Sequence, residues 1–241
     1  MPSSIFKFKA FAIEQKEVAM KIGTDGVLLG AWAEIPERAK NILDIGTGTG
    51  LLSLQAAQRT SGAAQILGVD IDRSAVKTAT ENFKNSSWSS CLTAKEWNIT
   101  AESKTLVTEN FDCILCNPPF FEGGPVGLKT NRNMARVASY MHWPILFERV
   151  ASLLSDKGVA NLILPFESFE KARKLAQDNG LYLKRYCLVK GHKDAPVKRV
   201  LMSLSREKSE VIKEEELIIE EVRHQYTKAY YDLVQPFYLK L

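Results

Sequence analysis

Two short motifs in this chain contain residue types that could do chemistry, and the more informative one is Asn117-Pro118-Pro119-Phe120. The Asn117 side-chain oxygen and the Pro118 carbonyl can each accept one N–H of a planar amino group. Pro119 fixes the turn by locking φ and restricting the residue before it, and Phe120 can stack on a base. The motif is therefore predicted to hold an exocyclic amine by positioning, without a metal or a strong general base. The alternative is a Pro-Pro strand terminator with an incidental asparagine.

The second motif is the glycine loop Asp44-Ile45-Gly46-Thr47-Gly48-Thr49-Gly50, about seventy residues upstream of the first. Its glycines permit a tight turn and let a ligand come close to the backbone. The spacing differs from the Gly-x-Gly-x-x-Gly of dinucleotide enzymes, and no Lys-Ser/Thr follows as in a phosphate-binding loop. The loop therefore predicts a nucleoside-type cofactor, unless it serves tight packing alone.

Asp70 follows the glycine loop by twenty residues and ends the next apolar run. A carboxylate at this place can accept hydrogen bonds from the ribose hydroxyls of a nucleoside cofactor. It could instead cap the following helix, but Asp72 or Ser74 can take that role, and we expect the two roles to be split. Together, the amine-holding turn, the glycine loop and this acid predict methyl transfer from S-adenosylmethionine to a nitrogen.

The elements that must position these residues alternate between strands and helices. Seven strands are expected near residues 41–45, 66–70, 92–99, 111–116, 158–164, 181–189 and 199–205, and helices near 51–59, 72–83, 144–154 and 168–179. The alternation predicts an α/β fold with a doubly wound, mostly parallel, seven-stranded sheet. The last two strands have no helix between them, so the last strand is expected to be antiparallel. The acidic run 214–216 is expected to form a solvated turn. Ligands in such sheets bind at the carboxyl ends of the strands, where the glycine loop, Asp70 and Asn117 all fall.

Composition indicates an ordinary globular protein. The chain has 241 residues, 45% of them hydrophobic and 25% charged, and its net charge of +4 permits an anionic partner without demanding one. No apolar stretch approaches the ~20 residues of a membrane helix and no secretion signal is visible, so we expect a cytoplasmic protein. Cys113 and Cys116 form a CxxC, but on a strand they would point to opposite faces, so no metal site is expected.

The two motifs resemble those of class I S-adenosylmethionine-dependent methyltransferases of the amino-methylating branch, whose fold is Rossmann-like. Within that branch, the chain resembles bacterial tRNA(Val) adenine-N6 methyltransferases, which modify adenine-37 beside the anticodon. The resemblance rests on the Asn-Pro-Pro-Phe turn and on segments 8–11, 20–32, 87–88, 135–136, 199–201 and 226–239. It implies a monomeric enzyme with one methyltransferase domain over 1–241. In that domain, 1–40 would cover substrate and cofactor, 41–206 would form the catalytic core, and 207–241 would be a C-terminal extension.

The resemblance also implies roles for individual residues. Asn117, Pro118 and Phe120 would hold the target adenine. The cofactor set would be Asp44, Gly46, Gly48, Gly50, Asp70, Asn98, Lys21, Thr24 and Asp25. Within this set the glycines approach the methionine part, Asp70 the ribose and Asn98 the cofactor's adenine. Contacts with tRNA would come from Arg132, Arg136, Lys190, His192, Lys193, Lys198 and Arg199. Such phosphate contacts are largely independent of sequence, and solvated surface lysines are the alternative for each of them.

Three other functions are considered. Glutamine-methylating enzymes of release factors use a similar turn, because a glutamine amide resembles the edge of adenine, but they usually carry an additional N-terminal helical domain. Guanine-N2 methyltransferases of ribosomal RNA often have a duplicated or extra domain. A non-catalytic RNA-binding relative would be expected to have lost Asp44, Gly46, Asn117 or Phe120, and all four are present.

Overall fold

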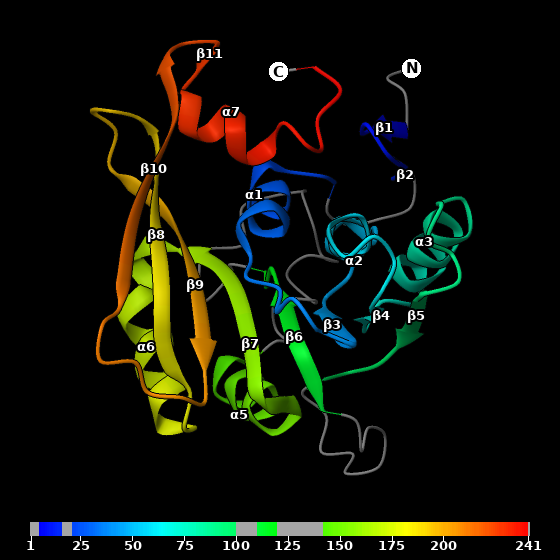
Figure 1. Ribbon diagram of the computed structural model, residues 1–241, viewed down its shortest axis with the longest axis horizontal. Coiled ribbons are helices and arrows are strands. Elements are labelled where there is room, and N and C mark those ends of the chain that lie inside the picture. The colour runs from blue at the N-terminus through cyan, green and yellow to red at the C-terminus, as the bar shows by residue number, and fades with distance from the viewer. Residues whose placement is uncertain (1–4, 16–20, 100–109, 120–141, 241) are drawn as a thin grey trace, which may run out of the picture.

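A large sheet runs through the part of the chain that the computed structural model describes, residues 5–15, 21–99, 110–119 and 142–240 (Figure 1). Its strands are β3 (Asn41–Ile45), β4 (Gln65–Asp70), β5 (Leu92–Glu96), β6 (Phe111–Cys116), β7 (Leu154–Pro165), β8 (Tyr182–His192), β9 (Val197–Ser205), β10 (Lys213–Val222) and β11 (Gln225–Tyr226). In these residues the sheet has nine strands in the order β11-β10-β8-β9-β7-β6-β3-β4-β5.

The sheet is mostly parallel and doubly wound, as the alternation of elements predicts. Strands β5, β4, β3, β6 and β7 pair in parallel, and β9 is antiparallel to both of its neighbours, β7 and β8. The chain passes from β3 outward to β5 and then returns to β6 on the other side of β3. This reversal is the switch point at which α/β sheets bind their ligands.

Two strands extend the sheet beyond the seven expected from the sequence. Strand β10 pairs in parallel with β8, and β11 pairs antiparallel with β10. The acidic run 214–216 therefore lies in a strand, and the expectation of a solvated turn is wrong. The physical reason is cross-strand pairing, because Glu216 lies 2.6 Å from the Lys190 Nζ and Glu215 lies 3.6 Å from the Arg185 Nη1, both on β8.

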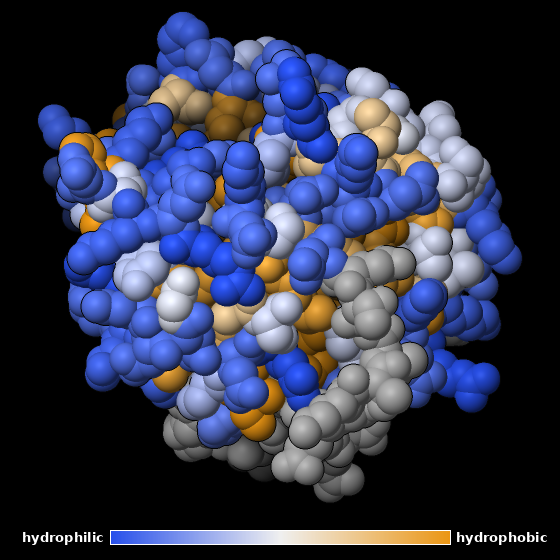
Figure 2. Space-filling model, turned by 60° about the horizontal axis from the view of Figure 1, so that its bottom comes forward, coloured by the Kyte–Doolittle hydropathy of each residue, from blue (hydrophilic) through white to orange (hydrophobic). Residues whose placement is uncertain are grey.

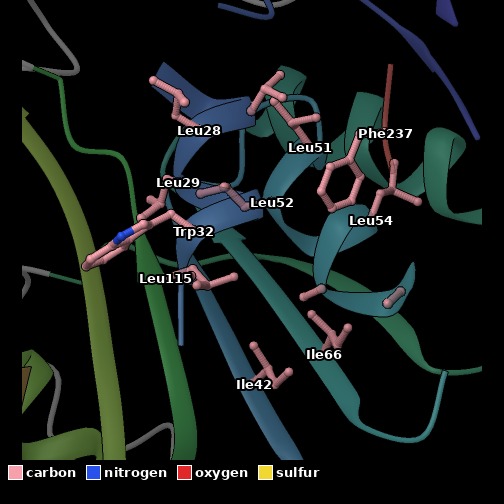
Figure 3. Packing of buried hydrophobic residues seen from close by; sticks show 14 of the residues in the cluster. Leu28, Leu29, Trp32, Ile42, Leu51, Leu52, Leu54, Ile66, Leu115 and Phe237 are labelled. Atoms are coloured by element: carbon pink, nitrogen blue, oxygen red, sulfur yellow. The ribbon is translucent and has the colours of Figure 1, made fainter. Parts of the chain in front are cut away.

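Helices cover both faces of the sheet and divide the core in two. The helices are α1 (Thr24–Trp32), α2 (Leu51–Arg59), α3 (Arg73–Lys84), α5 (Trp143–Leu153), α6 (Phe169–Asp178) and α7 (Lys228–Val234), with a short 3-10 turn, η1 (Phe166–Ser168). Ile42 packs with α1, α2 and α3, whereas its neighbour Leu43 packs with α5 and α6. Figure 3 shows the first of these clusters, in which leucines of α1 and α2 lie above Ile42 and Leu115. Successive side chains on a strand point to opposite faces, so each buried strand contributes residues to both hydrophobic clusters.

The buried cysteines follow the same alternation. Cys113 packs in the first cluster and Cys116 in the second, so they lie on opposite faces, as predicted. Burial raises the pKa of the Cys113 thiol to about 12 and raises that of Cys116 further. Within the described ranges, no group of three His, Cys, Asp or Glu side chains could hold a metal ion.

Helix α1 lies close against α2 because glycines face the contact. A Cβ at Gly30 would come within 2.0 Å of the Gln55 Oε1, and one at Gly26 would come within 2.9 Å of the Leu51 Cδ2. Gln55 is fully buried and donates from its Nε2 to the Val27 carbonyl at 3.1 Å. Glycine at these two positions therefore sets the distance between the helices.

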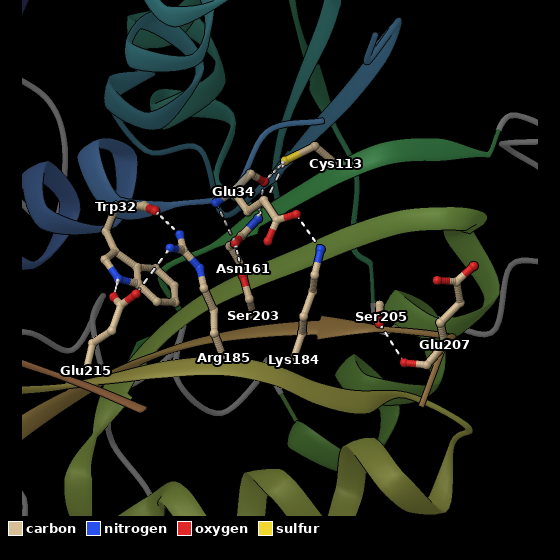
Figure 4. Close-up of polar contacts among 10 residues, drawn as sticks. All are labelled: Trp32, Glu34, Cys113, Asn161, Lys184, Arg185, Ser203, Ser205, Glu207 and Glu215. Atoms are coloured by element: carbon tan, nitrogen blue, oxygen red, sulfur yellow. Dashed lines mark hydrogen bonds and ion pairs between the residues drawn. The ribbon is translucent and has the colours of Figure 1, made fainter. Parts of the chain in front are cut away.

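Polar contacts fasten the C-terminal end of α1 to the sheet (Figure 4). The Trp32 indole N–H donates to the Glu215 carboxylate at 2.7 Å, and the Arg185 guanidinium stacks 3.9 Å from the Trp32 ring centroid. Just beyond the helix, Glu34 and Asn161 exchange two hydrogen bonds, from the Glu34 N–H at 2.9 Å and from the Asn161 Nδ2 at 3.0 Å. The end of α1 is therefore held by β7, β8 and β10 together.

The two ends of the described chain meet (Figure 1). A hairpin of β1 (Ile5–Lys7) and β2 (Ala12–Glu14) precedes α1, and Phe8 forms an antiparallel bridge with Tyr238. The Phe8 ring lies 4.7 Å from that of Phe11 and 5.9 Å from that of Tyr238, centroid to centroid. Buried Phe237 packs beside Leu54 of α2 (Figure 3). Buried Phe8, Phe11 and Phe237 thus join the two ends of the chain to the first hydrophobic cluster.

Most of the surface in the view of Figure 2 is hydrophilic, with apolar side chains visible between the charged ones near its centre. Among the described helices, none has the length and apolar character needed to cross a bilayer.

The α1–α2 contact gives a test of the fold. We expect Gly30→Ala to lower the free energy of unfolding by ~1–3 kcal/mol, because the new methyl group must displace the buried Gln55 amide. This loss should exceed the gain in helix propensity of at most about 1 kcal/mol. Urea unfolding measures the difference. Gly191→Ala is the control, since a Cβ there meets nothing within 4 Å, and an equal effect of both substitutions would contradict the interpretation.

Candidate active site

The carboxyl ends of three neighbouring strands bring the two motifs and Asp70 together. In the register of the sheet, Ile45 of β3 lies beside Cys116 of β6 and beside Val69 of β4. The next residue on each strand is Gly46, Asn117 and Asp70, respectively. Residues that are about seventy positions apart in the sequence therefore start from adjacent backbone positions at one edge of the sheet.

The glycine loop turns sharply between β3 and α2. Gly46, Gly48 and Gly50 have φ values of 74°, 56° and 84°, in the left-handed region that favours glycine. The N–H groups of Gly46 and Thr47 both donate to the Val69 carbonyl, at 2.8 and 2.9 Å. A Cβ at Gly50 would come within 2.4 Å of the Phe83 ring, whereas one at Gly48 would meet nothing closer than a backbone oxygen at 3.9 Å. Gly50 thus serves packing, and Gly48 leaves open space for a ligand.

Asp44 is a fully buried carboxylate beneath the loop. Its Oδ2 accepts hydrogen bonds from the Thr47 Oγ1 at 2.7 Å, the Ser53 Oγ at 2.7 Å and the Ser53 N–H at 3.2 Å. Its Oδ1 is buried without a partner among the described residues. Burial raises the pKa of Asp44 to about 6, because desolvation outweighs the three hydrogen bonds. The ionised side chain shapes the loop and keeps one acceptor oxygen unused.

Asp70 and Asp72 divide the roles that the sequence left between them. The Asp70 Oδ2 accepts from the Gly48 N–H at 3.0 Å and its Oδ1 from the Asp72 N–H at 2.9 Å. Desolvation raises the pKa of Asp70 above its ordinary value. Asp72 is the N-cap of α3, and its carboxylate accepts from the Ser74 N–H at 2.9 Å. The cap assignment is confirmed, and Asp70 is held at the glycine loop with lone pairs to spare for a ligand.

Asn117 is half-buried, yet its Oδ1 is a buried oxygen without a partner among the described residues. Its Nδ2 lies 3.9 Å from the position that a Cβ would take at Gly26 of α1. Pro118 is buried, and Phe120, Arg132 and Arg136 lie outside the described residues. A buried acceptor without a donor is costly to maintain, so this oxygen has the capacity to accept an N–H.

The other expected site residues lie around this centre. Asn98 is half-buried two residues beyond β5, whose last residue Glu96 lies beside Asp70 in the register. Lys21 and Thr24 are exposed at the start of α1. The cofactor roles of these three residues stay predictions.

The residues expected to contact RNA divide into paired and exposed side chains. His192, Lys193 and Lys198 are exposed on the β8–β9 hairpin. Lys190, by contrast, pairs with Glu216 across 2.6 Å. Arg199 pairs with Asp25, which the sequence assigned to the cofactor. The hairpin lies at the same edge of the sheet as the glycine loop, since Arg199 lies beside Pro165 at the carboxyl end of β7.

Asn82 of α3 is a site residue that the sequence did not reveal. Its Nδ2 donates to the Thr49 carbonyl in the glycine loop at 2.9 Å and to the Glu14 carbonyl at 3.0 Å, while its Oδ1 accepts from the Glu14 N–H at 2.9 Å. One buried amide therefore joins the N-terminal hairpin to the loop. Its place on the apolar face of α3 was the available signal.

These features fit a nucleoside cofactor. The fit rests on the open space at Gly48, on the Asp70 carboxylate at the end of β4, and on the oxygens of Asp44 and Asn117 that have no partner in the described part of the chain. With the strand order and the antiparallel β9, they define the class of Rossmann-like class I methyltransferases.

Comparison with known proteins narrows this class. Residues 22–141 match the family described as methyltransferase small domain. A tRNA1(Val) (adenine(37)-N6)-methyltransferase of Christiangramia forsetii is 41% identical over 244 residues, covering all of both chains. One from Vibrio vulnificus is 42% identical, covering 98% of this chain and 96% of the relative. The chain belongs to the tRNA1(Val) (adenine(37)-N6)-methyltransferase family.

A solved structure confirms the fold. A predicted O-methyltransferase from Agrobacterium tumefaciens superposes with a TM-score of 0.66 at 19% identity, covering 88% of this chain and 96% of that one. At this identity the likeness concerns the architecture alone.

The buried Asp44 predicts a dependence of stability on pH. Its pKa rises from 3.8 to about 6 on folding, so its stabilising contribution is complete below pH 4 and is lost as the pH rises through 6. We therefore expect wild type to lose ~2–3 kcal/mol of unfolding free energy relative to Asp44→Asn between pH 4 and 7. Urea unfolding of both proteins at several pH values measures this, and a difference that stays constant would refute the assignment.

Proposed function

We propose that this protein transfers a methyl group from S-adenosylmethionine to the N6 amine of an adenine in tRNA, adenine-37 of tRNA1(Val) as in its relatives' names. The observation that carries the proposal is the Asn117 Oδ1 at the end of β6, which is buried without a partner among the described residues and lies one strand away from the glycine loop. An acceptor oxygen in that place suits an amino group, because the N–H of the amine can donate a hydrogen bond to its free lone pair.

The cofactor would be held by the carboxyl ends of β3, β4 and β5. Gly48 has open space beside it for the methionine part, and Asp70 has lone pairs for the ribose. Gly46 would also approach the methionine part, and Asn98 would contact the adenine. The unpartnered Oδ1 of Asp44 adds a negative charge beneath the loop. Lys21 and Thr24 would close the site from the start of α1. When bound, S-adenosylmethionine supplies an electrophilic methyl group next to a cationic sulfur.

The acceptor adenine would be positioned by the Asn-Pro-Pro-Phe turn. Asn117 Oδ1 and the Pro118 carbonyl would accept the two N–H bonds of the amine, which turns its lone pair toward the methyl group. Phe120 would stack on the base, which must leave its stack to enter the pocket. An exocyclic amine is a weak nucleophile, because its lone pair is delocalised into the ring. The enzyme would therefore raise the rate by holding the amine in the reactive geometry.

The tRNA would approach along the carboxyl edge of the sheet. His192, Lys193 and Lys198 on the β8–β9 hairpin are exposed there, and Arg132 and Arg136 follow the amine-holding turn in sequence. Lys190 and Arg199 have carboxylate partners, so we assign them smaller shares of phosphate binding. We further propose that residues 1–241 act as a single methyltransferase domain, in a monomeric, cytoplasmic enzyme.

Labelled S-adenosylmethionine tests the proposal when offered with unmodified tRNA, ribosomal RNA, duplex DNA and release factor in parallel. Label is expected in N6-methyladenosine of tRNA. Label in N2-methylguanosine or in methylglutamine would instead assign the enzyme to a sister family. Cofactor binding without any transfer would indicate a non-catalytic RNA-binding relative.

Asn117→Ala removes the acceptor oxygen from the amine. We expect kcat to fall by at least about a hundredfold, while calorimetric binding of S-adenosylmethionine stays near wild type. Asn179→Ala, at the C-terminal end of α6, serves as the control and should leave kcat unchanged. A kcat near that of wild type for Asn117→Ala would contradict the proposed mechanism.

Asp70→Ala and Asp72→Ala separate ribose binding from helix capping. Loss of the Asp70 carboxylate should weaken binding of S-adenosylmethionine about ten- to a hundredfold, because charged hydrogen bonds are lost. Loss of the Asp72 cap should instead lower the unfolding free energy by about 1 kcal/mol with little change in affinity. Calorimetry measures the affinity and urea unfolding measures the stability of both variants. Lower stability in Asp70→Ala and weaker cofactor binding in Asp72→Ala would mean that the two roles are exchanged.

A further inference from the structure

An ion pair joins two residues that the sequence assigned to different ligands. The Arg199 Nε donates to the Asp25 Oδ2 at 2.8 Å, and both side chains are roughly two-thirds buried. Asp25 lies in the first turn of α1, and Arg199 lies near the start of β9. The Arg199 Nη1 also donates to the Lys198 carbonyl at 3.1 Å, which fixes the guanidinium where Asp25 meets it.

The first turn of α1 forms a wall beside the amine-holding residue. Gly26 follows Asp25 directly and is buried. A Cβ on Gly26 would lie 3.9 Å from the Asn117 Nδ2 and 2.9 Å from the Leu51 Cδ2. Only the space of a missing methyl group therefore separates the helix backbone from the Asn117 amide, and a shift of this turn would change the room in which that amide is held.

This turn has weak support of its own. The N-cap Gly23 provides no side-chain hydrogen bond, and the first intrahelical bond, from the Val27 N–H to the Gly23 carbonyl, is long at 3.4 Å. The other end of α1 is fastened by Trp32 and Glu34 to three strands (Figure 4). A carboxylate in the first turn stabilises the helix terminus, and in Asp25 that same carboxylate is tied to β9.

We propose that Asp25 and Arg199 are positioning residues that hold the first turn of α1 against Asn117, so that its Oδ1 keeps the orientation that accepts the target amine. The inference rests on the proposed function and deepens it. The sequence assigned Asp25 to the cofactor and Arg199 to RNA. In this inference the two side chains instead contact each other.

A double-mutant cycle tests the pairing. Asp25→Asn and Arg199→Gln are each expected to lower kcat about tenfold, with KM for S-adenosylmethionine and for tRNA within about twofold of wild type. The double variant should be no slower than the slower single variant, because either substitution already breaks the pair. Ion pairs that remain about one-third exposed add little to stability, so thermal unfolding should shift by only a few degrees.

Other outcomes identify the competing roles. Separate roles would show as a raised KM for the cofactor in Asp25→Asn and a raised, salt-dependent KM for tRNA in Arg199→Gln. The losses in the double variant would then multiply. That result would mean that the residues act on separate ligands and that the inference is wrong. Lys174→Gln with Asp178→Asn removes an exposed pair on α6 and should leave kcat unchanged. Should a neutral variant fail to fold, Asp25→Glu and Arg199→Lys form the cycle. A wild type that does not methylate tRNA rejects the proposed function, whereas an active wild type with multiplying losses rejects the inference alone.

Discussion

In-register parallel pairing of β6, β3 and β4 is the constraint on which the site depends. It places Asn117, Gly46 and Asp70 at the ends of adjacent strands, so that the residues proposed for the acceptor and for the cofactor share one edge. Side chains alternate along a strand with a period of two, so a shift of one residue would turn each strand's buried side chains to the wrong layer. The two hydrophobic clusters, which divide at Ile42 and Leu43, therefore hold this register.

Burial of polar groups at the edge is compatible with stability because most of them are paired. Asp44 has hydrogen bonds on one oxygen, Asp70 bonds to the loop it faces, and Asn82 satisfies its amide on the loop and on the N-terminal segment. Two oxygens at this edge, Asp44 Oδ1 and Asn117 Oδ1, are buried without a partner among the described residues. A buried acceptor without a donor costs desolvation free energy, and a ligand that donates a hydrogen bond to it recovers that cost on binding.

Helix α1 connects this edge with the rest of the fold. Its glycines bring it close to α2, its C-terminal end is fastened to β7, β8 and β10, and its first turn is tied to β9. Each of these contacts is made by residues more than twenty positions apart in sequence. The segment preceding the catalytic core is thus part of the site's geometry.

The sequence by itself determined the central strands, their helices and the meeting of the glycine loop, Asp70 and Asn117, because local periodicity and parallel topology fix where strands end. Helix α2 and strand β6 have the expected bounds. Only the tertiary structure decided that residues 214–216 form a strand, that Asn82 supports the loop and that Asp25 pairs with Arg199. Polar side chains take their role from the partner that folding brings to them, and local periodicity does not encode which distant residue that partner is.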